Sequence, residues 1–474
     1  LQQHHQLCWT AGLNPVRILD AGMQLSYMAI AGVSLGNYGM KRLHKKTGFR
    51  RFQKRYPLRF RVVQSLFYSV TLQGMMLLVV AKTYYEIPVY AGLLNLIVVP
   101  GMTVVVAGSW FGLLVSIGTI SLGRFVMLPV GWMLQGYTWL CERTLELPWN
   151  TLVTGEIRGW QIGMWYGGIA CTLVLLRTKT RNKLRDFVYK HTGRFWRKRE
   201  VVRYTVCTIL ISMLLQGAGQ ALCVWQQRTE AIYFLDVGQG DGILIRSPDG
   251  RNIVIDGGST SQSKCGTYTL LPALRSQGMT EIDCWFVTHT DEDHISGLKE
   301  LLLQGKLTQI KVRTVVFSAY VFQDAALAEL EAVIRAAGIT IVWMREGDVI
   351  GDDTFTLTCL HPTAEYRAKD KNAASLALAY HSDTFDMLFT GDMDADAVAD
   401  MDIQQDYDCI KLPHHGSKYS YVEGVYAHAD YGLISCGYNN RYGHPHTEVL
   451  QGLAQEGTKV LRTDEMGAVV FRGR

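Results

Sequence analysis

Long apolar runs fill the first half of the chain. They include Val62–Ala81, Val89–Val106, Val126–Trp139, Trp160–Leu176 and Tyr204–Trp225. Each has roughly the 17–25 residues that cross a bilayer, or falls a little short. Soluble proteins also bury apolar helices, but they rarely string so many long runs together. The pattern therefore predicts an α-helical transmembrane bundle over residues 1–229.

Beyond residue 230 the pattern changes to short runs of β-branched and aromatic residues, which are typical of strands. These runs are Ile232–Val237, Gly242–Arg246, Ile253–Asp256, Asp283–Thr288, Thr314–Phe317, Phe355–Leu360, Leu376–Tyr380, Met387–Phe389, Cys409–Leu412, Gly432–Ser435 and Val469–Phe471. Helical patterns at Ser296–Leu303, Ala325–Ala337 and Thr447–Glu456 each end near a glycine suited to a C-cap. Two sheets packed face to face with helices outside, a four-layer α/β sandwich, would accommodate this order over residues 230–474.

Charge separates the same two halves. Residues 1–229 hold 27 Lys and Arg against 7 Asp and Glu, whereas residues 230–474 hold 20 against 35. Of the 27 cations, 21 lie in two loops, at 41–61 and 177–203. Because cationic loops stay in the cytosol, both loops are expected on that side of the membrane.

The span Tyr204–Trp225 follows the second cationic loop and would carry the chain outward, placing residues after about Arg228 on the outer face. The spans between the two loops must then be even in number. The weaker candidates Gly108–Pro129 and Val126–Trp139 leave that number open, because one of them can lie along the membrane surface. The chain starts at Leu1 and its first apolar stretch, Ile18–Leu35, begins almost at once, which suggests a fragment.

The sharpest chemical signal is Thr288–His294 (THTDEDH), directly after the apolar run Cys284–Val287. In a turn that leaves a strand, His289 and Asp291 can point to one side and Asp293 and His294 to the other, so the loop can serve two cations. Asp and His are also common in turns that bind no metal. Two imidazoles and two carboxylates at this spacing would nevertheless repel one another or waste donors without a cation.

Three further clusters follow predicted strands. Asp392 ends Leu388–Asp392 (LFTGD), where it could bridge two metals or instead cap a helix at Ala395–Met401. The pair His414 and His415 lies in Leu412–Lys418 (LPHHGSK). The last cluster is Asn440–His446 (NRYGHPH).

Ten cysteines are scattered without a Cys-x-x-Cys pair, so neither a zinc ribbon nor a redox motif is indicated. Five of them, Cys265, Cys284, Cys359, Cys409 and Cys436, would face an oxidising exterior, where one disulfide is possible.

The His-x-Asp-x-Asp-His element, followed by Gly-Asp and His-His-Gly-Ser, resembles the metallo-β-lactamase superfamily. Phe234–Asp241 (FLDVGQGD), Asp256–Gly258 (DGG), Leu412–Ser417 and Tyr442–His446 are more narrowly similar to the extracellular domain of the ComEC family of competence DNA-uptake proteins. Asn14-Pro15, Gln24–Tyr27 (QLSY) and Leu94–Pro100 (LNLIVVP) resemble that family's channel domain, and its usual amino-terminal domain would precede Leu1. The resemblance implies a transmembrane bundle followed by a metallo-β-lactamase-like αββα sandwich.

The same resemblance implies two divalent metal ions. Asp293, His294 and His414 would hold one ion, His289 and Asp291 the other, and Asp392 would bridge them. The catalytic group would comprise Asp293, which is also a ligand, and His415, His446 and Lys418, with His444 and Arg441 as further candidates for phosphate binding or proton donation.

Two positions depart from the superfamily pattern. Asp291 stands where a second His is usual, and Asn372 replaces the ligand His that usually precedes Gly-Asp. Oxygen ligands favour harder ions, so manganese or magnesium is as plausible as zinc.

The expected function is DNA uptake across the bacterial cytoplasmic membrane in natural transformation, with the outer domain acting as a nuclease that degrades one incoming strand. The partners would be DNA, membrane lipid and other competence-machinery proteins. The excess of 15 negative charges on residues 230–474 repels nucleic acid at long range and argues against this reading. Two alternatives are a membrane-tethered hydrolase of a small ester or cell-wall phosphodiester, and a DNA channel whose outer domain is a non-catalytic metal-binding guide.

Overall fold

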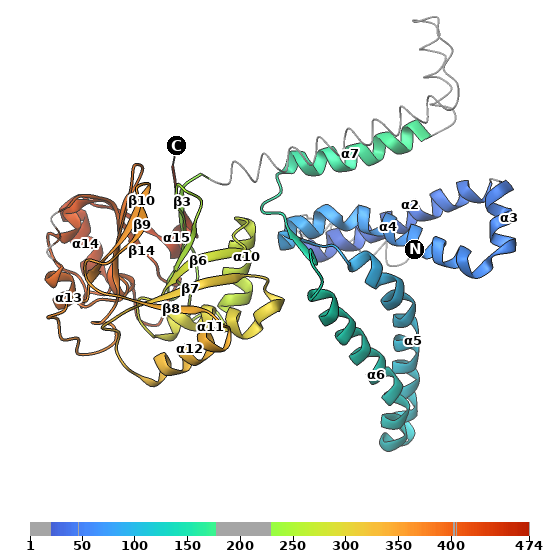
Figure 1. Ribbon diagram of the computed structural model, residues 1–474, viewed down its shortest axis with the longest axis horizontal. Coiled ribbons are helices and arrows are strands. Elements are labelled where there is room, and N and C mark those ends of the chain that lie inside the picture. Colours follow the sequence, from blue (N-terminus) through green and yellow to red (C-terminus); the bar gives the residue numbers. More distant parts are fainter. Residues whose placement is uncertain (1–19, 46, 177–228, 402, 404, 474) are drawn as a thin grey trace, which may run out of the picture. The chain divides into compact units, whose positions relative to one another are not determined.

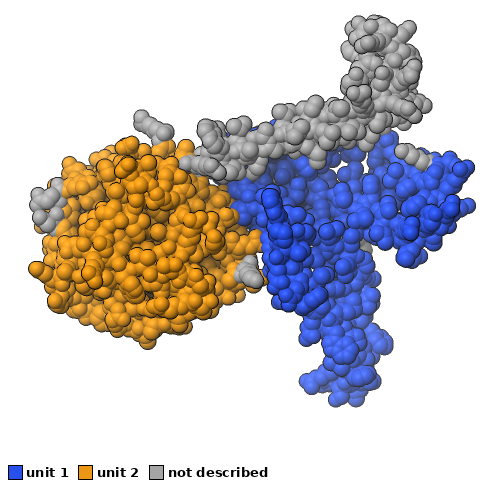
Figure 2. Space-filling model, in the orientation of Figure 1, with its two compact units in different colours: residues 1–222 blue, residues 223–474 orange. Residues whose placement is uncertain are grey.

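The computed structural model describes residues 20–45, 47–176, 229–401, 403 and 405–473. The chain divides into two compact units, Leu1–Leu222 and Cys223–Arg474 (Figure 2). The predicted span Tyr204–Trp225 and the cationic loop at 177–203 lie outside the described residues. They stay predictions, as does the expected domain boundary between residues 229 and 230.

The described part of the first unit is helical (Figure 1). Its helices are α2 (Ala21–His44), α3 (Thr47–Arg55), α4 (Pro57–Tyr84), α5 (Ala91–Gly118), α6 (Ile120–Leu145) and α7 (Gly159–Leu176), and its strands are β1 (Glu86–Pro88) and β2 (Thr151–Val153). Among these described helices, α4 and α5 are long and apolar enough to cross a membrane. The helical prediction is therefore confirmed for the described part of this half, whereas the full transmembrane bundle stays a prediction.

The predicted apolar stretch Gly108–Pro129 is divided between two helices. Thr119 has extended backbone angles, so α5 ends at Gly118 and α6 begins at Ile120. The two helices then run back along each other, because a Cβ built on Gly101 would meet Tyr137, near the far end of α6.

Helix α2 packs closely on α4 through two glycines one turn apart. A Cβ at Gly32 would lie 2.8 Å from the Cα of Leu72, and one at Gly36 would lie 2.5 Å from Cδ1 of Tyr68. Small residues four apart allow such close approach of helices where lipid provides no hydrophobic drive for association.

The second unit contains two sheets of seven described strands each. One sheet has the order β16-β3-β4-β5-β6-β7-β8, and the other has the order β15-β14-β13-β12-β11-β10-β9. The strands of the first are β3 (Ala231–Phe234), β4 (Gly242–Arg246), β5 (Asn252–Asp256), β6 (Glu281–Phe286), β7 (Lys311–Ser318), β8 (Thr340–Met344) and β16 (Val469–Arg472). Those of the second are β9 (Val349–Asp352), β10 (Phe355–His361), β11 (Ala377–Ser382), β12 (Asp386–Phe389), β13 (Tyr407–Lys411), β14 (Ala429–Ile434) and β15 (Lys459–Arg462).

Three apolar layers hold the sheets and helices together. The central layer joins the facing sides of the two sheets, where the Phe234 and Phe389 rings lie 6.0 Å apart. An outer layer joins the first sheet to α10 (Leu271–Ser276), α11 (Glu292–Gln304) and α12 (Ala325–Ala336). The other outer layer joins the second sheet to α13 (Ala395–Asp400) and α14 (Thr447–Glu456) (Figure 1). The order helix, sheet, sheet, helix confirms the predicted sandwich.

Cys265, Cys284, Cys359, Cys409 and Cys436, the cysteines that the structure describes in the second unit, are free thiols, so the disulfide that the sequence left possible among them is not formed.

Candidate metal centre

The Thr288–His294 loop joins the end of β6 to the start of α11. Because β6 runs parallel to β5 and β7, its carboxyl end opens at the edge of the sheet, where loops can converge. Asp291 has extended backbone angles at the N-cap of α11, which places Asp293 and His294 in the first turn. A carboxylate there is favoured by the helix dipole.

The second sheet contributes residues from two neighbouring parallel strands. Asp392 follows β12, and the pair His414 and His415 follows β13. Both histidines have left-handed backbone angles, with φ of 49° and 56°. Such angles are unfavourable for residues other than glycine and cluster at functional sites. The same turn points the two rings in different directions.

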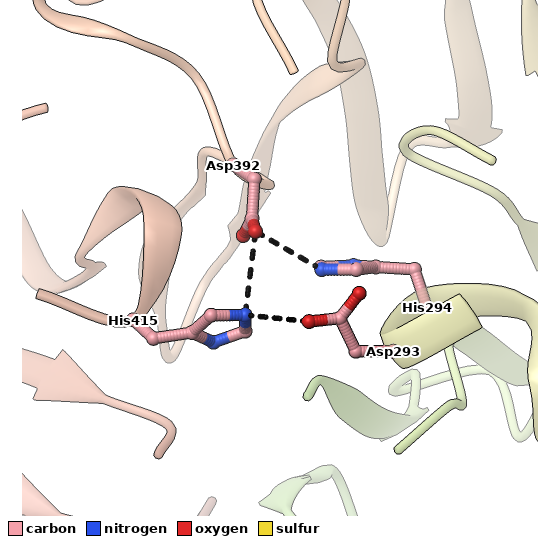
Figure 3. A group of neighbouring side chains, drawn as sticks. All are labelled: Asp293, His294, Asp392 and His415. Carbon is pink, nitrogen blue, oxygen red and sulfur yellow. Dashed lines mark ion pairs between the residues drawn. The ribbon is translucent and has the colours of Figure 1, made fainter. Parts of the chain in front are cut away.

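Four side chains from the two sheets meet at one point (Figure 3). Nε2 of His294 lies 3.4 Å from Oδ2 of Asp392, and Nε2 of His415 lies 3.3 Å from the same oxygen. Nε2 of His415 is also 3.5 Å from Oδ2 of Asp293. One ligand atom of each residue lies within 4.8 Å of the others. We call Asp293, His294, Asp392 and His415 the four-residue cluster.

The donor set of the four-residue cluster fits a divalent cation. Nδ1 of His294 bonds to Oδ2 of Asp256 at 2.8 Å, and Nδ1 of His415 bonds to the carbonyl oxygen of Ser435 at 2.8 Å. These bonds direct both Nε2 atoms toward Asp392, the usual second-shell arrangement of metal-binding imidazoles. Both Nε2 atoms are buried and make no hydrogen bond within the described part of the chain. Buried polar atoms rarely go unsatisfied, which indicates a missing partner between them.

Charge in the cluster is strongly coupled. Burial opposes protonation of His415, but Asp392 and Asp293 raise its pKa to about 10. Burial likewise opposes ionisation of Asp392, yet the charges of His415 and His294 hold its pKa well below the ordinary value. Imidazolium rings thus act as the counter-cations of the carboxylates, and a divalent ion held by the same residues would supply that positive charge in place of their protons.

His289 and Asp291 lie beside the cluster. The His289 ring centroid is 4.0 Å from that of His294, and its buried Nε2 is 3.6 Å from Oδ2 of Asp291. Asp291 also forms an ion pair with Lys371. Burial would raise the pKa of Asp291, but His289 and Lys371 lower it to about 2. Asn372 stands where the superfamily usually has a ligand His, and the residue before it, Lys371, already neutralises the charge of Asp291.

The remaining predicted residues lie around the cluster. His414 Nε2 is 4.0 Å from Oδ2 of Asp392, and its side chain is 34% exposed. His446 occupies the N-cap position of α14, and its Nδ1 accepts a hydrogen bond from the backbone N–H of Lys418 at 3.3 Å. His444 lies between them, with its ring 5.6 Å from that of His414 and 5.0 Å from that of His446. The structure therefore gathers the predicted residues at one edge of the sandwich and puts His415 closer to Asp392 than His414.

The sequence does not single out three buried residues that support the cluster, namely Asp241, Asp256 and Lys411. Asp256 ends β5 and accepts hydrogen bonds from the Thr288 backbone at 2.8 Å and its hydroxyl at 2.7 Å. Asp241 lies 3.6 Å from Nδ1 of His415 and pairs with Lys411. The motifs FLDVGQGD and DGG contain both acids, but nothing in their spacing shows which histidine each will meet. The alternative prediction for Asp392, that it caps the helix at Ala395–Met401, is wrong, because the N-cap of that helix, α13, is Asp394.

Family models match part of each half of the chain. Residues 7–179 match the family described as Competence protein, and residues 235–364 match the metallo-beta-lactamase superfamily. The chain combines a competence region with a metallo-β-lactamase domain. The resemblance to the ComEC family is thereby confirmed. The divalent metal binding expected of this fold agrees with the donor set of the cluster.

Two curated relatives carry competence names. ComE operon protein 3 of Bacillus subtilis is 32% identical over 256 residues, which cover 50% of this chain and 32% of the relative. Competence protein ComA of Neisseria gonorrhoeae is 26% identical over 289 residues, covering 56% of this chain and 38% of the relative. The matched region thus spans only about a third of each ComEC-type relative.

Solved structures with some likeness include the metallo-beta-lactamase fold protein YhfI from Bacillus subtilis, with a TM-score of 0.34 and 14% identity over 52% of this chain and 100% of YhfI. Another is Zn²⁺-bound PqqB from Methylobacterium extorquens, with a TM-score of 0.34 and 9% identity over 51% and 99% of the two chains. Likeness at this level says nothing of function.

Proposed function

We propose that the second unit is a two-metal phosphodiesterase that degrades one strand of incoming DNA during natural transformation, while the first unit passes the other strand through the cytoplasmic membrane. The observation that carries the proposal is the meeting of Asp293, His294, Asp392 and His415, with two unsatisfied ring nitrogens facing a shared carboxylate. The competence region at residues 7–179 supports DNA as the substrate.

The four-residue cluster would hold one ion, and we propose that His289 and Asp291, which lie 3.6 Å apart, hold the second ion together with His414 and Asp392, which lie 4.0 Å apart. Manganese, zinc and magnesium all suit such mixed carboxylate and imidazole donors. When bound, divalent ions lower the pKa of water toward neutrality and stabilise both the attacking and the leaving oxygen of a phosphodiester.

The chain's own groups would bind and protonate the substrate. Lys418 and Arg441 are exposed cations at the rim and would contact phosphate oxygens. Burial and the nearby His415 lower the pKa of His444 to about 4, so His444 is uncharged near neutral pH and is a poor proton donor. Donation to the leaving oxygen would therefore fall to His446, with a proton drawn from solvent.

A reconstituted cleavage assay tests this function. The whole chain would be purified in lipid nanodiscs and given manganese, magnesium or zinc with labelled single- and double-stranded DNA and a small phosphodiester. We expect metal-dependent DNA cleavage that Asp293→Ala abolishes. Asp353→Ala, in the exposed turn between β9 and β10, is the matched carboxylate control and should keep full activity. Cleavage of the small ester alone would instead support a membrane-tethered hydrolase.

One observation favours the second alternative, a DNA channel with a non-catalytic metal-binding guide domain. Lys371 is ion-paired with Asp291, so a lysine already supplies positive charge at the expected second metal position. Metal content measured by mass spectrometry separates the two readings. Two ions per chain with turnover support the nuclease, whereas one ion without turnover supports the guide domain.

The membrane placement belongs to the same proposal. The described cations of the loop at 41–61 lie at the end of α2, along α3 and at the start of α4, and this side is proposed to face the cytosol with lipid head groups around it. The second unit would then lie on the outer face, where DNA and other competence proteins arrive. A reporter enzyme fused after Arg228 should be active outside the cell, and cytosolic activity would overturn this orientation.

A further inference from the structure

A continuous series of ring contacts leads from the four-residue cluster to the protein surface. The ring of His415 lies 6.3 Å from that of His444. His444 then stacks with Tyr442 at 5.7 Å and an interplanar angle of 21°, and it contacts His446 at 5.0 Å. His446 in turn meets Tyr419 at 6.2 Å. The series therefore ends in two tyrosines, one on each branch.

Both terminal tyrosines are open to solvent, because Tyr419 is 73% exposed and Tyr442 is 43% exposed. Large aromatic side chains with this much exposed surface forgo the stabilisation that burial brings. Isolated exposed tyrosines are ordinary on protein surfaces. Tyr419 and Tyr442 are not isolated, because each ends a series of ring contacts that starts at the four-residue cluster.

A cationic side chain lies close to the ring of each tyrosine. The guanidinium carbon of Arg441 lies 4.7 Å from the Tyr442 ring centroid, and Nη2 donates to the Tyr442 hydroxyl at 2.5 Å. Nζ of Lys418 lies 5.6 Å from the Tyr419 ring centroid and 3.4 Å from a carboxylate oxygen of Glu448. Arg441 forms no ion pair with any carboxylate that the structure describes, so its charge is available to an anionic ligand. These cations stand out because residues 230–474 carry 35 acidic against 20 basic residues.

We propose that Tyr419, Tyr442, Lys418 and Arg441 form a stacking platform for single-stranded nucleic acid beside the metal centre. Flat rings with adjacent cations suit a ligand that presents bases and phosphates together, and base stacking on aromatic side chains tolerates any sequence. In a duplex the base faces are already stacked on one another, so the platform selects unpaired strands or frayed ends. This inference rests on the proposed nuclease function and names the form of DNA that its site takes.

The platform would allow the second unit to bind DNA despite the net negative charge of residues 230–474. Long-range repulsion by the acidic unit weakens encounter, but salt screens it beyond about 8 Å at physiological ionic strength. Stacking and two local cation contacts act within that distance. Binding would therefore depend on the tyrosines more than is usual for proteins that hold nucleic acid through an extensive basic surface.

Equilibrium binding without metal tests the platform. The whole chain in nanodiscs, treated with EDTA so that no cleavage occurs, would be titrated into a fluorescent oligonucleotide and into the duplex of the same length, with anisotropy as the readout. We expect tighter binding of the single strand. Tyr442→Ala and Tyr419→Ala should each weaken single-strand binding about tenfold and leave duplex binding nearly unchanged.

Matched variants separate stacking from a folding defect. Tyr442→Phe and Tyr419→Phe keep the ring and should bind almost as the natural chain does. Tyr268→Ala removes a tyrosine that is 70% exposed and belongs to neither branch, and it should have no effect.

The outcomes distinguish this proposal from the nuclease function. DNA cleavage with single-strand affinity unaltered in the Tyr419→Ala, Tyr442→Ala double variant overturns the platform and leaves the nuclease standing. Tyrosine-dependent binding without any DNA turnover supports the platform and rejects the nuclease. Equal loss of single-strand and duplex affinity, or no measurable single-strand binding by the natural chain, also overturns the platform.

Discussion

Lys411 is ion-paired with Asp241 in the interior, where its side chain is 1% exposed and that of Asp241 is 2% exposed. Its Nζ also donates to the carbonyl oxygen of Gly391 at 2.9 Å and lies 3.6 Å from Oδ1 of Asp392. Burial alone would lower the pKa of Lys411, but the charges of Asp241 and Asp392 raise it. A fixed ammonium thus offsets part of the negative charge that surrounds the metal centre and holds the turn before Asp392.

Replacing Lys411 by methionine should destabilise the second unit strongly. The change leaves Asp241 buried without its counter-charge, and breaking a buried ion pair in this way typically costs about 3–5 kcal/mol. Hydrogen exchange of peptides from β12 and β13 measures the opening free energy of this unit directly. We expect the opening free energy measured for those peptides to fall by about 3–5 kcal/mol.

The paired substitution is the control for a simple packing defect. Asp241→Asn together with Lys411→Met removes both charges, so the double variant should be less destabilised than the sum of the two single variants. Additivity within about 0.5 kcal/mol would show that the two charges are not energetically coupled.

Metal affinity should distinguish the two adjacent histidines. His415 faces Asp392 with its ring fully buried, whereas His414 is partly exposed and more distant from that carboxylate. We therefore expect His415→Ala to lose at least about 100-fold in manganese or zinc affinity, beyond the usual effect of outer partners. His414→Ala should lose less. Isothermal titration of the nanodisc-held chain gives both values, and equal losses would place both rings in the same metal shell.

Asp256 should act on the metal through His294. Its carboxylate bonds to Nδ1 of His294 and fixes the ring with Nε2 toward Asp392. Outer partners of this kind are worth roughly 10–100-fold in metal affinity. Asp256→Asn should fall in that range in the same titration, and an unchanged affinity would show that His294 keeps its orientation without this bond.

Periodicity was sufficient to locate most elements of the sandwich, because its strands are buried on one or both faces and their composition reflects that burial. The same periodicity does not predict strands β8, β9 and β15. These three strands lie at the sheet edges, and β8 and β9 expose most of their residues to solvent. Their sequences therefore lack the regular alternation of apolar and polar residues that predicts a half-buried strand. The helix at Glu292–Gln304 was predicted to begin four residues late, since its first turn consists of site residues with no apolar pattern.

The candidate site was predictable as a set of loops but not as a set of contacts. Strand ends supplied Asp293, His294 and Asp392, all of which meet in the structure. The choice between His414 and His415 depends on two successive left-handed residues, which turn the second ring inward. Sequence spacing does not encode that turn. The run Cys409–Leu412 predicts a strand but gives Lys411 no role, since the acid that stabilises its buried charge, Asp241, lies 170 positions earlier in the chain.

Gly32 and Gly36 should be intolerant of larger residues. A Cβ at Gly32 would meet the backbone of α4, which cannot move aside without separating the two helices. Gly32→Ala and Gly36→Ala should therefore lower the thermal stability of the first unit in detergent, by roughly 1–3 kcal/mol each. Gly74→Ala is the matched control within α4, since a Cβ there has no neighbour within 4 Å, and it should be neutral or slightly stabilising.

The thiols of the second unit should resist alkylation while it is folded. Burial raises the pKa of Cys265 and Cys359 to about 12 and, together with the neighbouring Asp283, raises that of Cys284 to about 11. A thiol reacts as its thiolate, so below these pKa values the protonated form prevails and labelling is slow. Iodoacetamide labelling followed by mass spectrometry should be negligible at pH 8, rise with pH at Cys284 first, and become fast in urea, where the pKa returns to about 8.5. Rapid labelling of Cys265 in the folded chain at pH 8 would show that the layer between the first sheet and its helices opens readily to solvent.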